Sequence, residues 1–190
     1  MSEKTLLEKA MEVREEFASN YMSTPLISLG YRDKQIHLTK SGFFNIFTAE
    51  EIIVRERDCT LYRHKVSAIF EGYEMFCLTD MYEDEIYEEI QEIPKEDYYE
   101  LLKSFVELKE KFESVVRSSL FGHIDNDGIN IRKPFFDEFD IFDEWSFKKK
   151  SEYKDGSSWY QAKYKGFYFN YVVNIDKEPW FKKYIFELSA

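Results

Sequence analysis

One stretch of this chain, residues 95–120, carries apolar residues at steps of three and four and lies between two regions whose apolar residues alternate. The stepped residues form the stripe of a long amphipathic helix. They are Tyr98, Leu101, Phe105, Leu108, Phe112 and Val115. The alternating regions predict strands on both sides of this helix. We therefore expect an α+β fold in which antiparallel sheet regions flank a central helical segment at about 80–120.

The turn signals place hairpins in both strand regions. Glu71-Gly72 and Lys165-Gly166 each separate two apolar runs by two residues, the spacing of a tight hairpin. The aromatic content of 18%, against only 7 Gly and 4 Pro, favours a substantial sheet. The strand candidates are 35–38, 43–47, 51–57, 61–70, 73–78, 129–132, 159–164 and 167–175.

Two further helices are expected. Residues 3–21 predict an N-terminal amphipathic helix in which Thr5 and Glu8 form a capping box. Residues 80–93 predict a short helix with Asp80 as its N-cap and Glu83 at the capping-box position. We interpret 1–190 as a single α+β domain, with 121–125 as the place where a division would fall, and we recognise no internal repeat.

The composition indicates a cytoplasmic protein. The amino terminus has no apolar stretch of the kind found in secretory signals, and no run approaches a membrane span. Cys59 and Cys77 lie in strand-like segments without Cys or His at ligand spacing, so we expect both to be reduced and buried.

Negative charge is concentrated in two stretches. The chain carries a net charge of −11. Residues 80–100 hold ten acids against Lys95, and residues 125–144 hold seven acids against Arg132 and Lys133. Charge runs are commonly solvated faces, and the acids at the predicted helix starts complement the helix dipole.

Three acids of the first stretch do not fit that explanation. Glu88, Glu89 and Glu92 lie at the predicted C-terminal end of a helix, where an acid costs about 0.3–1 kcal/mol. Acids kept against local stability indicate a binding surface. The candidate partner-binding residues are Glu85, Glu88, Glu89, Glu92, Glu96, Asp137, Glu138 and Asp140.

This charge pattern favours a non-catalytic interaction protein that binds a basic nucleic-acid-handling protein. Its acids would imitate a phosphate backbone, as acidic inhibitors of restriction and CRISPR nucleases do. An immunity protein against a basic toxin would use the same physics. This interpretation expects no cofactor, no metal, no catalytic residue, no membrane contact and no nucleic acid on the acidic surface.

A second hypothesis assigns nucleic-acid binding to the C-terminal segment. Lys165-Gly166-Phe167-Tyr168-Phe169 resembles the opening of the RNP1 pattern of RNA-binding sheets, although the later positions depart from it. Residues 148–190 hold nine lysines against five acids, a local charge of +4, with aromatic residues between them. A single-strand binder of this kind requires Lys165 and Tyr168 to be exposed together. The alternative is an aromatic hairpin packed on the long helix with its lysines outward.

A third hypothesis is a metal-dependent hydrolase with scattered acidic ligands. Residues 123–128 match part of a calcium loop, with Asp125 and Asp127 at the third and fifth positions. His123 and Pro134 replace the first acid and the bidentate glutamate, so a tight turn explains Asp127-Gly128 more simply.

Overall fold

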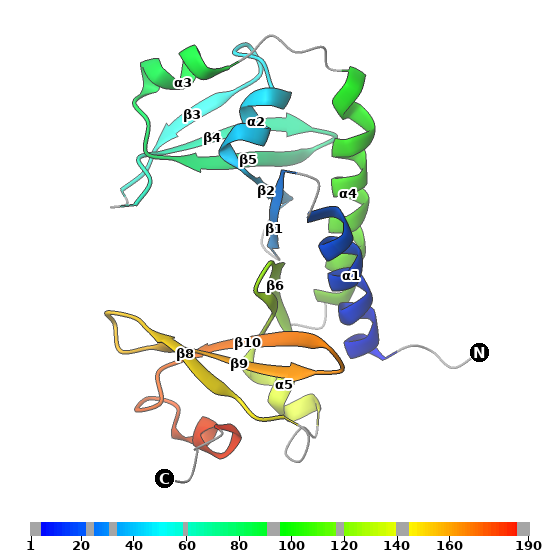
Figure 1. Cartoon of the computed structure of the whole chain (residues 1–190), viewed down its shortest axis with the longest axis vertical. Coiled ribbons are helices and arrows are strands. Elements are labelled where there is room, and N and C mark those ends of the chain that lie inside the picture. Colours follow the sequence, from blue (N-terminus) through cyan, green and yellow to red (C-terminus); the bar gives the residue numbers. More distant parts are fainter. Residues whose placement is uncertain are drawn as a thin grey trace, which may run out of the picture.

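The computed structural model describes residues 5–21, 25–30, 34–58, 61–90, 96–116, 120–139 and 145–185. It shows a mixed α+β protein with helices and one ten-stranded, mostly antiparallel sheet (Figure 1). The strand order is β3-β4-β5-β2-β1-β6-β7-β10-β9-β8. The strands expected on either side of the long helix therefore belong to one continuous sheet rather than to separate regions.

The first half of the chain runs from α1 to α3. Its elements are α1 (Leu6–Tyr21), β1 (Leu26–Gly30), β2 (Gln35–Leu38), α2 (Lys40–Ile46), β3 (Ile53–Glu56), β4 (His64–Phe70), β5 (Tyr73–Thr79) and α3 (Glu83–Glu89). The second half runs from α4 to a terminal 3-10 helix. Its elements are α4 (Glu96–Val116), β6 (Phe121–Asp125), β7 (Gly128–Ile131), α5 (Lys133–Glu138), β8 (Lys148–Glu152), β9 (Ser158–Tyr164), β10 (Phe167–Val173) and η1 (Pro179–Tyr184).

The two halves share one order of elements, which is a repeat that we did not recognise in the sequence. Each has a helix, a hairpin, a short helix, three antiparallel strands and a final short helix. In each half the third strand of this set pairs in parallel with the second strand of the hairpin, β5 with β2 and β10 with β7. Both β4–β5 and β9–β10 turn through two residues with positive φ, Glu71-Gly72 and Lys165-Gly166, as a type I′ turn requires.

The short helices α2 and α5 confirm the repeat in their side chains. The rings of Phe43 and Phe47 lie 4.7 Å apart at 41°, and those of Phe135 and Phe139 lie 4.8 Å apart at 46°. The two helices follow β2 and β7 directly, and both bury consecutive phenylalanines. Helix α2 carries one more residue before its phenylalanines, Gly42, so the two sequences are out of step by one position.

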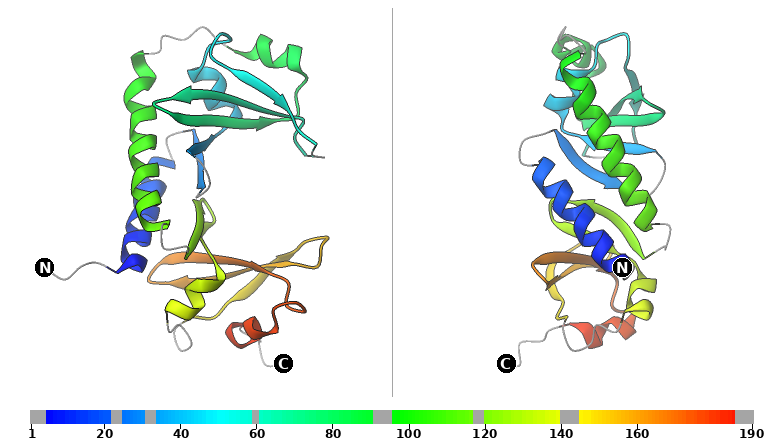
Figure 2. Two further views of the ribbon diagram at one scale, coloured as in Figure 1. Left: turned by 180° about the vertical axis from the view of Figure 1, so that it is seen from behind. Right: turned by 90° about the vertical axis from the view of Figure 1, so that its right-hand side faces the viewer.

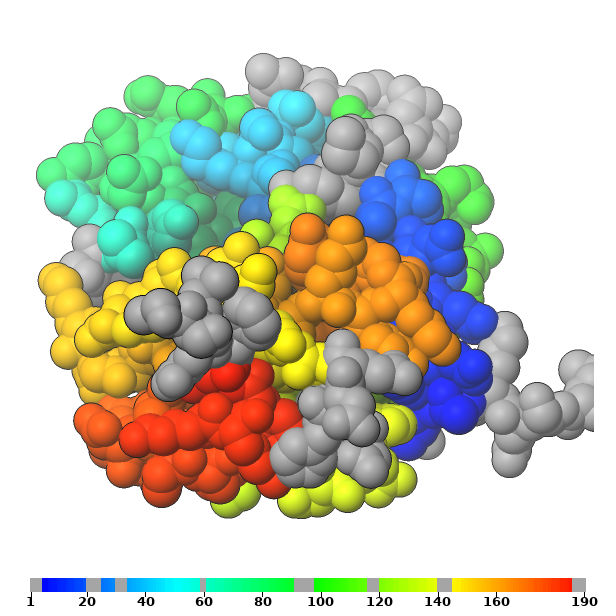
Figure 3. Space-filling model, turned by 60° about the horizontal axis from the view of Figure 1, so that its bottom comes forward, coloured from blue at the N-terminus to red at the C-terminus, as the bar shows by residue number. Residues whose placement is uncertain are grey.

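The halves meet at an approximate two-fold axis between β1 and β6. Leu29 pairs with Ile124 at the centre of this antiparallel contact, with Ser28 opposite Asp125 on one side and Gly30 opposite His123 on the other. The long helices are exchanged across the axis. Helix α1 packs on β6 and β7, helix α4 packs on β1 and β2, and the two pack against each other. Figure 3 shows α1 in blue beside the orange β10 of the second half.

One face of the sheet is buried and the other is open. Side chains of β5 alternate between buried and half-buried, and those of β2 do the same. The buried face carries the core, to which α2 and α5 add Phe43, Phe44, Phe135 and Phe136. The sheet bends so that its two ends project to the same side, while α1 and α4 lie on the other side (Figures 1 and 2).

Two local predictions are wrong. Residues 43–46 belong to helix α2 rather than to a strand, with Phe47 as the C-cap, because Thr39 caps the helix by accepting a hydrogen bond from the Gly42 amide at 3.1 Å. A short apolar run does not by itself distinguish a buried strand from a buried helix. The helix expected over 80–93 is described as Glu83–Glu89, and its capping box uses Tyr82 and Glu85 in place of Asp80 and Glu83. Among the described residues, no helix combines the length and the apolar content that a membrane crossing needs.

Candidate functional site

The open face of the sheet brings together residues that are far apart in the sequence. Strand pairing sets them in a row across the middle of the sheet, from β5 through β2 and β1 to β6 and from β7 through β10 and β9 to β8. Between β6 and β7, Asp125 pairs with Gly128, and its side chain contacts the Asn130 amide at 3.4 Å. The row consists of Phe76, His37, Ser28, Asp125, Asn130, Asn170, Gln161 and Lys148. Helices α1 and α4 lie on the other side of the sheet (Figures 1 and 2).

Bases gather on the open face although the chain as a whole is acidic. Arg55 lies opposite Lys65 in the β3–β4 pair and shares its face. The bases of the open face include Arg55, Arg57, Lys65, Lys148, Lys150, Lys163 and Lys165, and its acids include Glu74, Asp125 and Asp127. The acids of α3 lie at the far end of the molecule from β8–β10 (Figure 1). The charge of the open face is therefore opposite in sign to the net charge.

In the first half, Glu74 on the open face is already neutralised. Its carboxylate accepts hydrogen bonds from Lys65 at 2.8 Å and Gln35 at 2.5 Å, and Arg55 lies 3.6 Å away. Burial raises the pKa of Glu74, but the hydrogen bond and charge of Lys65 outweigh it and the net shift is downward. The Glu74 carboxylate therefore has its charge fully compensated, and its two basic partners, Lys65 and Arg55, leave the cluster positive.

His37 lies next to this cluster and stays neutral. Its ring stacks on Phe76 with centroids 4.6 Å apart. Burial first, and then the positive charges of Lys65 and Arg57, lower the pKa of His37 from 6.5 to about 4. A neutral imidazole is thus held within a positive field.

In the second half, the open face carries a basic-aromatic patch, which we define as Lys148, Lys150, Lys163, Lys165 and Tyr168. All five side chains are exposed, and Tyr168 retains 45% of its accessible area. The Lys163 ammonium lies 5.5 Å from the centroid of the Tyr168 ring. Lys148, Lys150, Lys163 and Tyr168 border a hollow of about 370 Å³. The single-strand hypothesis requires Lys165 and Tyr168 to be exposed together, and the structure has both exposed.

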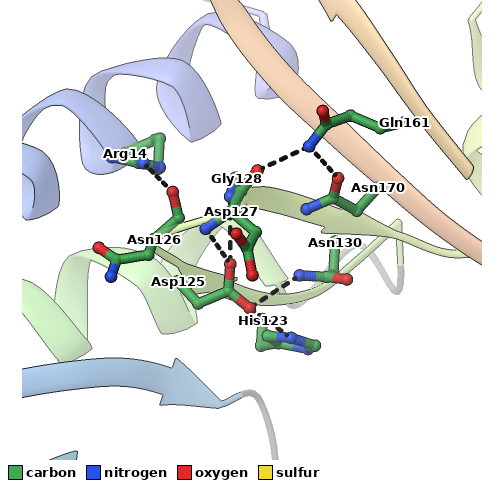
Figure 4. A network of polar contacts seen from close by, with 9 residues as sticks. All are labelled: Arg14, His123, Asp125, Asn126, Asp127, Gly128, Asn130, Gln161 and Asn170. Carbon is green, nitrogen blue, oxygen red and sulfur yellow. Dashed lines mark hydrogen bonds and ion pairs between the residues drawn. The ribbon is translucent and has the colours of Figure 1, made fainter. Parts of the chain in front are cut away.

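A second hollow of about 210 Å³ lies beside the patch, over a polar network of β6, β7, β9 and β10. The Asp125 carboxylate accepts from the backbone amides of Asp127 at 2.9 Å and Gly128 at 3.1 Å. It also accepts from the Asn130 amide at 3.4 Å, and it lies 3.0 Å from His123 Nε2. Figure 4 shows these residues converging on Asp125.

The same network extends to β9 and β10. Gln161 Nε2 donates to the Asp127 carbonyl at 3.1 Å and to Asn170 Oδ1 at 3.0 Å (Figure 4). Arg14 of α1 donates to the Asn126 carbonyl at 3.0 Å and holds the turn from the other side. A Cβ on Gly128 would lie 2.3 Å from the Tyr168 carbonyl oxygen, so glycine is required for β7 to approach β10 this closely.

The residues of the partial calcium loop therefore form a turn. Asp125 caps the two amides that follow it, which accounts for Asp127-Gly128 without a metal. The sequence favoured a tight turn over a calcium loop at 123–128, but we did not recognise that His123 and Asp125 form a His-x-Asp pair. Among the described residues, no group of three or more His, Cys, Asp or Glu side chains is arranged to hold a metal ion. Burial raises the pKa of Cys77 to about 12, so its thiol stays protonated, and Cys59 lies outside the described residues.

The acidic residues predicted to bind a partner do not converge. Glu85 accepts a hydrogen bond from the Tyr82 amide at 2.7 Å, Glu89 lies 3.6 Å from Lys40, and Glu88 is exposed on α3. Asp137 and Glu138 are exposed on α5, at the opposite end of the molecule (Figure 1). Glu96 is the first residue of α4, and Glu92 and Asp140 lie outside the described residues.

Comparison with known proteins adds no relative to this description. No family model matches the chain, and neither the curated proteins nor the solved structures contain a significant match. The candidate site therefore rests on its own geometry.

Proposed function

We propose that the chain is a non-catalytic binding protein that takes single-stranded nucleic acid on its basic-aromatic patch. The observation that supports this most is the exposure of Tyr168 beside a hollow bordered by Lys148, Lys150 and Lys163. An exposed aromatic ring stacks on a base for about 1–3 kcal/mol, whichever base it is. Lysines placed around that ring are positioned to contact the phosphates on either side.

Salt screening limits this function to short contacts, although the net charge is −11. At physiological ionic strength, salt screens both the acids and the lysines beyond roughly a Debye length, about 8 Å, so only charges close to the strand act on it. A ligand that spans the patch neutralises at most its four lysines. We therefore expect a shallow salt dependence, with a slope of log K against log salt of about −3 for a single strand.

The test is fluorescence anisotropy of a labelled single-stranded oligonucleotide over a salt titration. Tyr168→Ala should weaken binding about 5- to 150-fold, the equivalent of one lost stacking contact, while Tyr168→Phe should retain most of the affinity. Lys163→Gln should reduce the salt slope by about 0.7. The matched control is Lys182→Gln, an exposed lysine on η1, away from the open face, which should change neither quantity.

Two outcomes would contradict the proposal. Absence of binding at low salt would remove it outright. Equal binding of an acidic polypeptide that lacks bases, with no effect of Tyr168→Ala, would reduce the patch to a general anion attractor.

A basic protein partner for α3 is the second candidate function. Glu83, Asp84 and Glu88 are exposed there beside Tyr82 and Tyr87, which retain 57% and 45% of their accessible areas. Exposed acids interleaved with exposed tyrosines suit a basic cleft that normally takes a phosphate backbone. In this candidate function, only the acids of α3 imitate a phosphate backbone. An inhibitor and an immunity protein would both bind a basic partner through this surface.

A further inference from the structure

Hydrogen bonds beneath the hollow fix the orientation of the side-chain amides that form its floor. Asp125 is fixed by two backbone amides, so the Asn130 side chain must turn its Nδ2 toward that carboxylate. The Asp127 carbonyl accepts from Gln161, so Gln161 must turn its own Nε2 toward Asn170 Oδ1. Backbone groups thus determine the direction of both asparagine amides, which side-chain shape alone leaves ambiguous.

This arrangement leaves one acceptor and one donor for a ligand. Asn130 uses Nδ2 within the network and retains Oδ1, while Asn170 uses Oδ1 and retains Nδ2. Asn130 and Asn170 are direct neighbours in the β7–β10 pair. Asn170 is only 1% exposed, and its Nδ2 donates to no other described residue. Among the described residues, no side-chain nitrogen or oxygen is both fully buried and without a partner, so this Nδ2 is open to the hollow, where water or a ligand satisfies it.

The walls of the hollow are aromatic. Trp159 of β9 is half-buried and lies opposite Val172, and Tyr153 retains 47% of its accessible area. The volume of about 210 Å³ is below the roughly 300–1,000 Å³ of sites that enclose drug-sized ligands. Such a space suits one flat ring rather than a larger molecule.

We propose that this hollow reads a single nucleobase of the strand that the neighbouring basic-aromatic patch binds. This inference rests on the proposed function, because the patch supplies the phosphate contacts and the hollow supplies none. The base stacks on Trp159 and exchanges two hydrogen bonds, accepting from Asn170 Nδ2 and donating to Asn130 Oδ1. The acid of the floor, Asp125, is engaged by His123, Asn130 and two amides, so the hollow favours an uncharged ring over a phosphate.

Asn170→Asp is the sharpest test of the donor–acceptor pair. The substitution keeps an oxygen for Gln161 and replaces the free donor with an acceptor, so the floor then presents two acceptors. Guanine is the base whose pairing edge offers two adjacent donors, N1–H and N2–H. We therefore expect the native chain to bind base-bearing oligonucleotides more tightly than an abasic oligonucleotide, and Asn170→Asp to shift its preference toward guanine by about tenfold or more.

Trp159→Leu gives an independent test, because it removes the stacking wall without changing the floor. It should reduce the advantage of a base-bearing over an abasic oligonucleotide by about fivefold or more. The matched control is Ile69→Ala, an exposed aliphatic residue of β4 that does not line this hollow and should leave base preference unchanged. A thermal melt of each variant verifies that it is folded before binding is measured.

The outcomes separate this inference from the proposed function. If abasic and base-bearing oligonucleotides bind equally to the native chain, the base-reading hollow is wrong while the patch stands. If base preference is unaffected by both Asn170→Asp and Trp159→Leu, selectivity lies elsewhere and the inference is overturned. If no oligonucleotide binds, the proposed function and the inference fail together.

Discussion

The pKa of His37 reflects its burial and the positive charges around it on the open face. Burial and the positive charges of Lys65 and Arg57 hold its pKa near 4, whereas in the unfolded chain the pKa is 6.5. Below pH 6.5 the unfolded chain binds a proton that the folded chain does not. The free energy of unfolding therefore falls as the pH drops from about 6.5 to about 4.

Replacing His37 should flatten this part of the stability profile. The ceiling of the effect at pH 4 is about 3 kcal/mol, and we expect less because the side chain is only partly buried and solvent screens its charge. Urea unfolding of the native chain and of His37→Gln at pH 7 and pH 4.5 measures the difference. An equal loss of stability in both proteins would show that carboxylates alone cause the acid sensitivity.

At the same scale, the residues of the candidate site lay largely beyond sequence reasoning. Lys165 and Tyr168 were found because a local pattern carries them. Asn130, Asn170 and Gln161 have no motif. Gln161 and Asn170 are opposite each other in the β9–β10 hairpin, but Asn130 joins them only because β7 and β10 pair in parallel across a long separation in sequence. The one local signal that was available is the His-x-Asp pair at 123–125.

Helix α3 carries acids near both of its ends, so the stabilising and the destabilising effect of an acid on a helix can be measured separately there. Glu85 serves the capping box at its start, whereas Glu88 lies near its C-terminal end, where the helix dipole disfavours an acid. The same substitution should therefore act in opposite directions. Glu85→Lys should destabilise the protein by about 0.5–2 kcal/mol, and Glu88→Lys should stabilise it by about 0.3–1 kcal/mol.

Chemical denaturation measures both changes, and it also informs the second candidate function. If α3 binds a basic protein, Glu88→Lys should weaken that binding while it raises stability, a combination that general unfolding cannot produce. Destabilisation by Glu88→Lys would show instead that this acid supports the fold.

The sequence predicted elements well where one local rule determined them. Both two-residue hairpins are confirmed, because glycine and positive φ at Glu71-Gly72 and Lys165-Gly166 admit few alternatives. The strand predicted over 43–47 was wrong, because a short buried apolar run fits a strand or a helix and the structure has helix α2 there. The repeat was hidden because Gly42 shifts one phenylalanine pair and because the two hairpins, β1–β2 and β6–β7, have connections of different length.

The exchange of α1 and α4 makes stability a property of the whole molecule. Helix α1 belongs to the first half of the chain but covers β6 and β7 of the second, and Phe17 within it is fully buried. All three tryptophans belong to the second half. A defect in α1 should therefore appear in a signal that comes from the opposite half.

Phe17→Ala should lower the free energy of unfolding by about 3–5 kcal/mol through the cavity that it leaves. Tryptophan fluorescence, which reports the second half, and far-UV circular dichroism, which reports both, should shift to the same midpoint. Ser19→Ala, an exposed position on the same helix, is the matched control. Separate midpoints for the two signals would mean that the halves unfold independently.

The two halves have nearly the same backbone, but they present different side chains at equivalent positions of the open face. Tyr168 is the second residue of β10 and Trp159 the second of β9, whereas Glu74 and Lys65 hold the same places in β5 and β4. The scaffold is close to that of a homodimer, but joining both halves in one polypeptide has let each acquire different side chains. A strand laid across it meets stacking rings at one end and a closed ion-pair cluster at the other. Such a surface has a polarity, so a chain with distinct 5′ and 3′ ends would be accepted in one direction and refused in the reverse.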